Sequence, residues 1–342
     1  MRRLSAAAAA LTIVLLLYWG LRVYTPAISD DPKSPGAAIA SLEQVDLGSS
    51  KQWILVRGKN VHAPIILFLH GGPGMPMMFL AHVFQAPLES HFLTVQWDRR
   101  GAGKSYSLNT DVSKMRLSQE IADTVSLIEK LRNRFGARKV ILVGHSYGTT
   151  LGVLVAARRP DLIQAYVGVG QEACDHKTQK RLQDSWLAQE ALRAHDTETF
   201  RQVTSGRPYD WESALFKYGG EILNKTSFLY LVEIGLRAPE YSLLDGFDVK
   251  AGVNFTHANM KNDVYGGALM DAVPTLAVPT YFLEGRRDYT SPFACAVRYL
   301  DRLKAPHKEL IWFDHSAHFP FLEESERFAT VLKRIDGETS HR

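Results

Sequence analysis

Cysteine is scarce in this chain, since its 342 residues include only Cys174 and Cys295. Two cysteines cannot form the disulfide framework that small secreted domains use, and a chain of this length can bury a large core without one. Both cysteines lie just beyond predicted strand ends at the same sheet edge, so one bridge is geometrically possible in an extracytoplasmic domain. We expect two ordinary buried thiols instead.

Internal repeats and clusters of basic residues are also absent. Low complexity is confined to one alanine run near the N-terminus, and the net charge of +4 is spread along the chain. A nucleic-acid-binding protein would carry a basic stripe or patch. The composition therefore indicates a folded globular protein, with one large core or two modest domains and no nucleic-acid partner.

A long apolar run occurs at the N-terminus. It spans residues 5–21, follows Met-Arg-Arg and ends before Arg22. Its length is near the lower limit for crossing a bilayer, and basic residues at the extreme N-terminus favour the cytoplasmic side. We expect residues 1–24 to be a membrane anchor that holds the catalytic domain outside the cytoplasm. A cleaved signal segment, which would give a secreted protein, is the alternative.

Strand-like and helix-like segments alternate after a proline-containing tether at residues 25–41. Residues 65–69 are continuously apolar, as in a strand covered on both faces, and residues 117–135 have helical apolar spacing before Gly136. This alternation predicts an α/β fold with a doubly wound, mostly parallel sheet. Further strands are expected at residues 52–56, 92–97, 140–143, 165–169, 280–283 and 308–313.

The pattern changes between residues 171 and 271. Strand-like runs disappear there, and glycines at 219 and 220 with prolines at 208 and 239 separate short helical segments. We interpret this segment as a helical cap inserted after the sixth strand of the sheet. The core would then comprise residues 42–170 and 272–342.

Residues 144–148, Gly-His-Ser-Tyr-Gly, form the most informative motif. An apolar strand ends abruptly here and a helix follows, with Ser146 at the corner. Such a tight corner needs small flanking residues, and the start of the helix directs free N–H groups toward developing negative charge. The pattern is the nucleophile elbow of the α/β-hydrolase fold, which predicts that Ser146 is a catalytic nucleophile.

A glycine-rich loop, His-Gly-Gly-Pro-Gly at residues 70–74, directly follows a predicted strand. Its backbone N–H groups are free to face a ligand. In the elbow fold this loop and the residue after the nucleophile supply the oxyanion hole. We therefore expect the N–H groups of Gly72 and Tyr147 to bind the oxyanion, with Gly71 as the fallback for Gly72.

The other members of a catalytic triad should follow in the order serine, acid, histidine. Asp288 and His318 each lie just beyond a predicted strand, in that order. His318 would take the proton of Ser146 and return it to the leaving group, while Asp288 would orient the imidazole and stabilise its charged form.

Each partner has an alternative. His315 lies on the same loop as His318, but it is adjacent to the strand end, where it would pack or face solvent. Glu172 could replace Asp288, because it follows another strand end. Glu284 lies inside a strand and is expected to be structural.

The segment at residues 98–105, Asp-Arg-Arg-Gly-Ala-Gly-Lys-Ser, contains a Gly-Lys-Ser sequence but is not a phosphate-binding loop. The first glycine of that motif would fall at position 98, which is Asp98, and no helix opens after it. We expect a structural loop held by Asp98 and the arginines. The predicted chemistry needs neither a metal nor a cofactor.

Taken together, the motifs at residues 70–74, 98–105, 144–148 and 316–318 resemble those of the prolyl iminopeptidase branch of α/β-hydrolases. The resemblance covers about residues 50–335. It implies release of an N-terminal residue, often proline, from a short peptide through an acyl-enzyme. It also implies that cap carboxylates bind the free ammonium group, for which Glu172, Glu233 and Glu240 are candidates.

The sequence thus predicts a serine hydrolase that acts on a short peptide or other small acyl substrate. A prolyl iminopeptidase-like aminopeptidase is the leading interpretation, and a carboxylesterase or lipase-like hydrolase of small esters is the alternative. A hydrolase-like binding protein without turnover is a third possibility, against which the complete Ser-Asp-His set argues.

Overall fold

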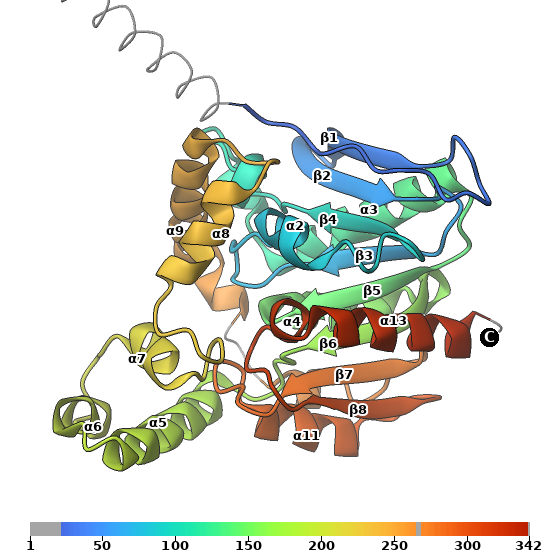
Figure 1. Cartoon of the computed structure of the whole chain (residues 1–342). Helices are drawn as coiled ribbons and strands as arrows, with labels where there is room; N and C mark the ends of the chain where they lie inside the picture. The colour runs from blue at the N-terminus through green and yellow to red at the C-terminus, as the bar shows by residue number, and fades with distance from the viewer. Residues whose placement is uncertain (1–21, 265–267, 341–342) are drawn as a thin grey trace, which may run out of the picture.

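The computed structural model describes residues 22–264 and 268–340. An eight-stranded sheet forms its centre (Figure 1). In chain order its strands are β1 (Ile39–Leu47), β2 (Ser50–Gly58), β3 (Ile65–Leu69), β4 (Leu93–Trp97), β5 (Val140–His145), β6 (Ile163–Val169), β7 (Thr280–Gly285) and β8 (Lys308–Phe313).

The spatial order of the strands is β1-β2-β4-β3-β5-β6-β7-β8. β2 pairs antiparallel with β1 and β4, whereas all pairs from β4 to β8 are parallel. The predicted doubly wound, mostly parallel sheet is therefore confirmed. β1, which forms one edge of the sheet, was not predicted from the sequence.

Helices cover both faces of the sheet. Ile65, Leu67 and Leu69 of β3 face one apolar cluster, and the alternate residues Ile66 and Phe68 face the other. The first cluster includes α3 (Leu117–Phe135), α4 (Tyr147–Arg158), α10 (Leu269–Ala272) and α11 (Phe293–Arg302); the second includes α2 (Ala81–Phe84), α12 (Pro320–Glu323) and α13 (Ser325–Thr339). Short 3-10 turns occur at Met78–Leu80, Gly103–Ser105, Val112–Lys114 and Pro160–Leu162.

A helical segment separates β6 from β7, as predicted for a cap after the sixth strand. Its helices lie beyond one end of the sheet, at the left of Figure 1. Backbone bonds join this segment to the loops after β7 and β8, since Glu221 O accepts from His318 N at 2.9 Å and Gly220 O accepts from Tyr289 N at 3.2 Å. The cap helices are α5 (His176–Arg193), α6 (Thr197–Thr204), α7 (Trp211–Tyr218), α8 (Leu229–Arg237) and α9 (Leu243–Val264).

The prediction of a membrane anchor requires correction. Within residues 22–264 and 268–340, no helix is both long enough and apolar enough to cross a bilayer. The predicted anchor at residues 1–24 falls almost wholly on residues 1–21, which lie outside the described residues. The expectations of membrane attachment, of a catalytic domain held outside the cytoplasm and of secretion are therefore withdrawn.

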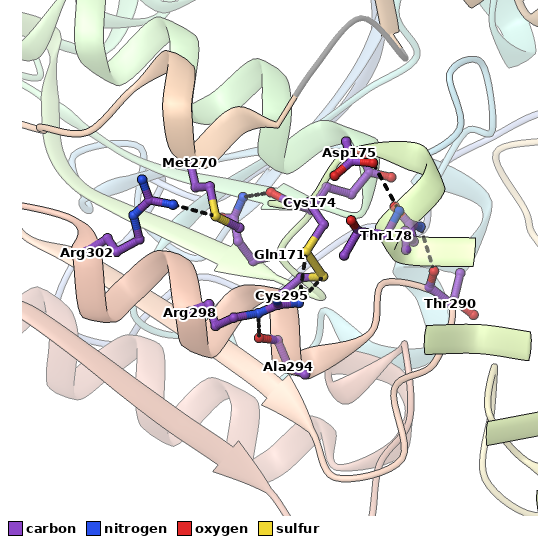
Figure 2. Close-up of a disulfide and its surroundings, with 12 residues drawn as sticks. Gln171, Cys174, Asp175, Thr178, Met270, Thr290, Ala294, Cys295, Arg298 and Arg302 are labelled. Carbon is purple, nitrogen blue, oxygen red and sulfur yellow. Dashed lines mark hydrogen bonds between the residues drawn. A yellow bond between two sulfur atoms is a disulfide. The ribbon is translucent and has the colours of Figure 1, made fainter. Parts of the chain in front are cut away.

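Cys174 and Cys295 form a disulfide, with Cα atoms 5.5 Å apart (Figure 2). The expectation of two buried thiols was wrong. β6 and β7 are neighbouring parallel strands, so the loops that follow them leave the sheet side by side. Cys174 lies in the loop between β6 and α5, and Cys295 lies in the first turn of α11. Because the two cysteines are 121 residues apart, the bridge encloses the whole cap.

Replacing both cysteines by alanine should lower the free energy of unfolding by about 2–5 kcal/mol, because the open chain regains conformational freedom when unfolded. Urea denaturation followed by circular dichroism measures the change. A thiol reductant should lower the wild-type midpoint to that of the double variant and leave the variant unaffected. An unchanged wild-type midpoint under reduction would contradict the stabilising role.

Candidate active site

Ser146 occupies a sharp corner between β5 and α4, with φ 53° and ψ −127°. This backbone conformation is unusual for a residue with a side chain. The corner depends on two glycines. A Cβ atom added to Gly144 would lie 2.5 Å from Gly148 O, and one added to Gly148 would lie 2.1 Å from Leu69 O. The half-buried Ser146 therefore stands where the end of β5, the start of α4 and the end of β3 meet.

The loop at residues 70–74 lies directly beside this serine. An added Cβ at Gly71 would approach Ser146 Cβ to 3.0 Å. Gly72 has φ 112°, a conformation that favours glycine, and an added Cβ there would lie 2.5 Å from Gly74 N. The loop predicted to supply an oxyanion donor thus packs against the predicted nucleophile, with Gly71 in the nearer position.

Asp288 and His318 form a hydrogen bond at the same end of the sheet. His318 Nδ1 lies 2.8 Å from Asp288 Oδ2, and the side chains of His318 and Asp288 are 2% and 0% exposed, respectively. A carboxylate can only accept, so Nδ1 carries the proton and the Nε2 atom faces away from the pair. Asp288 Oδ1 also accepts from Ser291 N at 2.9 Å, which fixes the carboxylate.

The sheet brings this pair close to the serine corner. The ring centroids of His145 and His318 are 4.6 Å apart, and His145 Nε2 lies 2.9 Å from His318 O. Ser146 N donates to Val169 O at 3.0 Å. An added Cβ on the next residue, Gly170, would lie 2.7 Å from His318 Nδ1 and 2.9 Å from Asp288 Oδ2. The loops after β5, β6, β7 and β8 therefore converge on one site.

Carboxylates control the charge of His318. Burial lowers its pKa, but Asp288, Glu221 and Glu172 together outweigh burial and raise the pKa to about 9. A folded-state pKa above the ordinary value means that proton binding by His318 stabilises the fold at acidic pH. That contribution is complete below about pH 6.5 and is lost as the pH rises through about 9.

Glu172 lies beside this histidine, in the loop after β6. Its Oε2 atom accepts from Thr150 Oγ1 at 3.3 Å, and its backbone N donates to Thr149 Oγ1 at 3.0 Å. Burial raises the pKa of Glu172 to about 7, although the charge of His318 opposes the change. The charge of Asp288 adds to the rise in the pKa of Glu172, so this carboxyl group interacts with both members of the Asp288–His318 pair.

Glu221 is a site residue that the sequence analysis missed. Its backbone oxygen accepts from His318 N, and its carboxylate accepts a hydrogen bond from the Thr290 hydroxyl. Burial raises the pKa of Glu221 despite the opposing charge of His318. The only signal in the sequence is its position directly after the glycine pair at 219 and 220, which identifies a turn and not a ligand.

Glu233 and Glu240 lie in different surroundings. Glu233 is on the exposed face of α8 and forms an ion pair with Arg237 at 2.6 Å. Glu240 is buried, and burial raises its pKa while Arg57 and Thr25 oppose the change. Neither carboxylate contacts Asp288 or His318 among the hydrogen bonds and ion pairs of the described residues.

Two further residues from the sequence analysis have clear surroundings: His315, the alternative base, and Glu284, which was expected to be structural. His315 is exposed, and its backbone N donates to Glu324 Oε1 at 3.0 Å. Glu284 is fully buried in β7 and accepts from Gln171 N at 2.9 Å. Burial and the nearby charge of Asp288 raise the pKa of Glu284 well above its ordinary value. Glu284 thus holds the turn that follows β6, which agrees with a structural role.

The loop at residues 98–105 is held from inside, as the sequence predicted. Asp98 accepts from Lys104 N at 2.8 Å and from the Tyr241 hydroxyl on the cap side. Burial raises the pKa of Asp98 to about 7, although these two hydrogen bonds oppose the change. Arg100 forms a buried ion pair with Asp123 of α3 at 2.8 Å.

One group among the described residues has ligand spacing suited to a metal ion. It consists of His307, Glu309 and Glu338, whose ligand atoms lie within 4.8 Å of one another. Arg334 already donates to both carboxylates at 2.9–3.0 Å. The arginine balances their charge, so we interpret the group as an ion-pair cluster on β8 and α13.

Comparison with known proteins agrees with this fold. Residues 66–331 match the Alpha/beta hydrolase family, which is most of the chain. The protein therefore belongs to the alpha/beta hydrolase family.

Relatives within that family include named peptidases. The chain is 29% identical over 307 residues to the "Probable aminopeptidase YbaC" of Bacillus subtilis, covering 87% of this chain and 96% of that protein. It is 24% identical over 296 residues to a proline iminopeptidase of Clostridioides difficile, covering 82% and 93%. These similarities support a hydrolase with prolyl iminopeptidase-like relatives.

Solved structures show the same fold. A proline iminopeptidase from Mycobacterium smegmatis aligns with a TM-score of 0.66 at 17% identity, covering 87% of this chain and 98% of that chain. A proline iminopeptidase-related protein from Thermus thermophilus aligns with a TM-score of 0.62 at 20% identity, covering 88% and 98%.

Gly170→Ala should disturb the Asp288–His318 pair, because a methyl group would overlap the imidazole. Gly136→Ala is a matched control, since both glycines have positive φ, at 57° and 70°, but nothing lies within 4 Å of an added Cβ at Gly136. Both variants should lose about 1–2 kcal/mol to backbone strain, and Gly170→Ala should lose more. Its low-field proton resonance from His318 Nδ1–H should also shift. Equal losses with an unchanged resonance would show that the site tolerates the methyl group.

Proposed function

We propose that this protein is a serine hydrolase in which Ser146 is the nucleophile, His318 the general base and acid, and Asp288 the residue that orients His318. The observation that supports this assignment best is the buried hydrogen bond between His318 and Asp288, beside a serine with φ 53°. These groups come from three loops at the same end of the sheet, in the chain order typical of this fold.

The proposed reaction proceeds through an acyl-enzyme. Ser146 Oγ attacks the substrate carbonyl carbon while His318 Nε2 takes the hydroxyl proton. The proton then passes to the leaving amine or alcohol as its bond to the acyl group breaks. Water deprotonated by His318 attacks the ester, and release of the acid restores the serine hydroxyl. Asp288 stabilises the charged imidazole in each half of the cycle.

The oxyanion formed in each half would be bound by backbone N–H groups. Tyr147 N lies at the start of α4, where the helix N-terminus favours negative charge. Gly72 is the proposed second donor, and Gly71 is its alternative because Gly71 packs directly against Ser146. Preorganised donors of this kind typically contribute about a hundred- to a thousand-fold to turnover.

An aminopeptidase acting on short peptides is the substrate class we favour. Such an enzyme must bind a free ammonium group, and Glu172 and Glu221 place two carboxylates close enough to His318 to raise its pKa. The names of the relatives from Bacillus subtilis and Clostridioides difficile support the same class. Glu233 is already paired with Arg237 and Glu240 lies near Arg57, so we assign neither to the ammonium.

An esterase acting on small acyl esters is the second candidate. It is favoured by the pKa of Glu172, raised to about 7 by burial, because a carboxyl group that is partly neutral at physiological pH binds a cation less strongly. Such an enzyme would accept substrates without a free amine.

A fluorophosphonate probe should label the wild-type protein and leave Ser146→Ala unlabelled. Labelling is measured by intact-protein mass spectrometry, and folding of the variant by circular dichroism. A folded wild-type protein that the probe does not label would favour a binding protein without turnover.

His318→Ala should reduce turnover by several orders of magnitude, whereas His315→Ala should retain activity within about two-fold. His315 is a matched control because it lies on the same loop but is exposed. The opposite ranking of the two variants would show that the general base had been assigned to the wrong histidine.

Substrate class can be decided with aminoacyl anilides, their N-acetylated forms and short-chain aryl esters. For an aminopeptidase, N-acetylation should reduce kcat/KM by about a hundred-fold or more, because it leaves the carboxylates without their cationic partner. Equal rates with and without the acetyl group would exclude the aminopeptidase and leave the esterase.

The pH dependence of kcat/KM should report the carboxylates around His318. His318 must be neutral to act as a base, so activity should rise with pH through a midpoint above 6.5. Glu172→Gln removes a charge that raises the pKa of His318, so it should move this midpoint to lower pH. The pH profile is measured with an ester substrate that lacks an amine. Glu233→Gln is the control and should leave the midpoint unchanged; a midpoint that Glu172→Gln leaves in place or raises would contradict the proposed electrostatics.

A further inference from the structure

Arg99 is a buried cation that follows β4 and contacts the glycine-rich loop. Its side chain is 1% exposed. Its Nη1 atom donates to His70 O at 2.7 Å and its Nη2 atom donates to Gly71 O at 3.4 Å. The guanidinium group thus holds two successive carbonyl groups at the start of the loop beside Ser146.

The backbone of Arg99 holds the same loop from a second direction. Arg99 N donates to His70 Nε2 at 3.2 Å, so His70 Nδ1 carries the proton and donates to Gly71 O at 2.9 Å. Burial and the charge of Arg99 lower the pKa of His70 well below its ordinary value, which keeps this neutral tautomer in place. The first two residues of the loop are therefore fixed by both the side chain and the main chain of Arg99.

Glu120 connects this arginine to the residue after the nucleophile. Glu120 is on α3 and is 4% exposed; its Oε1 atom lies 3.2 Å from Arg99 Nε. Its Oε2 atom accepts from the Tyr147 hydroxyl at 2.7 Å. Tyr147 is fully buried, and the Arg99 guanidinium carbon lies 5.4 Å from its ring centroid. One ion pair therefore contacts both segments that carry the proposed oxyanion donors.

We propose that Arg99 and Glu120 are positioning residues that set the distance between the two halves of the oxyanion hole. This inference rests on the proposed function. Oxyanion donors are effective only when they lie about 2.7–3.1 Å from the developing charge. Arg99 holds the loop that carries Gly71 and Gly72, while Glu120 holds the Tyr147 ring and, through it, the first turn of α4. Neither side chain needs to touch the substrate.

A positioning role predicts a specific kinetic effect. Loss of alignment should weaken binding of the transition state and leave ground-state binding unchanged, so kcat should fall while KM stays constant. A role confined to stability would instead reduce the amount of folded protein and leave the kcat of the folded fraction intact.

Tyr147→Phe is the sharpest test, because it keeps the aromatic ring and the backbone N–H and removes only the hydroxyl that donates to Glu120. We expect kcat to fall about 10- to 100-fold with KM within about two-fold of wild type. The affinity for a boronic acid that forms a tetrahedral adduct with Ser146 should fall by a similar factor. Glu120→Gln should show the same pattern more strongly, since it also leaves Arg99 without a counter-ion.

Asp123→Asn is the matched control. It disrupts an equally buried ion pair between the same loop and the same helix, since Arg100 and Asp123 are 3% and 2% exposed and lie 2.8 Å apart. Arg100 donates to Leu47 O and does not bond to the glycine-rich loop. This variant should lose stability while keeping the wild-type kcat and boronic acid affinity per folded molecule.

The outcomes separate this inference from the proposed function. If the wild-type protein is labelled by the fluorophosphonate at Ser146, and Tyr147→Phe keeps full kcat and boronic acid affinity, the positioning role alone is overturned. Equal losses of kcat in Tyr147→Phe and Asp123→Asn would also overturn it. If the folded wild-type protein is not labelled, the proposed function fails and the positioning role fails with it.

Discussion

A close approach between two backbone segments positions the nucleophile. The first turn of α4 passes the end of β3 so tightly that a methyl group at Gly148 would lie 2.1 Å from Leu69 O. This contact decides where Ser146 stands, and it also decides that the loop after β3 lies beside it. The nucleophile corner and the glycine-rich loop are thus two consequences of one packing constraint between neighbouring parallel strands.

The buried arginines near this corner are each paired with a buried carboxylate. Arg99 pairs with Glu120 and Arg100 with Asp123, so each buried guanidinium group has its own carboxylate on α3. Isolated buried charges would be costly, which explains why successive arginines face successive turns of one helix. Around His318 the balance is different, because several carboxylates surround a single imidazole. The proposed binding of a substrate ammonium group depends on this gathering of carboxyl groups around one imidazole.

The sequence was sufficient for much of the fold. Five of the strands, β3 to β7, are almost wholly buried and are followed by turn residues, and β2 and β8 contain shorter apolar stretches. The region that connects β6 to β7 lacks such strands. β1 escaped prediction because its sequence, IASLEQVDL, is only partly buried at the sheet edge and shows no clean alternation. The N-terminal apolar run was over-interpreted, since composition alone cannot separate a membrane span from other uses of an apolar segment.

The candidate site was predictable where a motif fixes position along the chain. Chain order and strand ends led to Ser146, Asp288 and His318, whose catalytic roles remain predictions. Site residues in the cap could not be predicted in this way, because the cap helices pack through residues that form no repeated sequence pattern. Glu221 was therefore missed, and Glu233 was proposed although it faces solvent. The disulfide was not expected for a similar reason: pairing depends on which strands become neighbours, and sequence separation does not reveal that.

The disulfide also changes what a break in the chain would do. Cys174 precedes α5 and Cys295 follows β7, so every cap helix lies inside the covalent ring that they close. A single cut by a protease anywhere within that ring would leave two polypeptides still joined through sulfur. The nicked molecule would keep its full mass until a reductant separated the pieces, and the two halves of the hydrolase core could not drift apart.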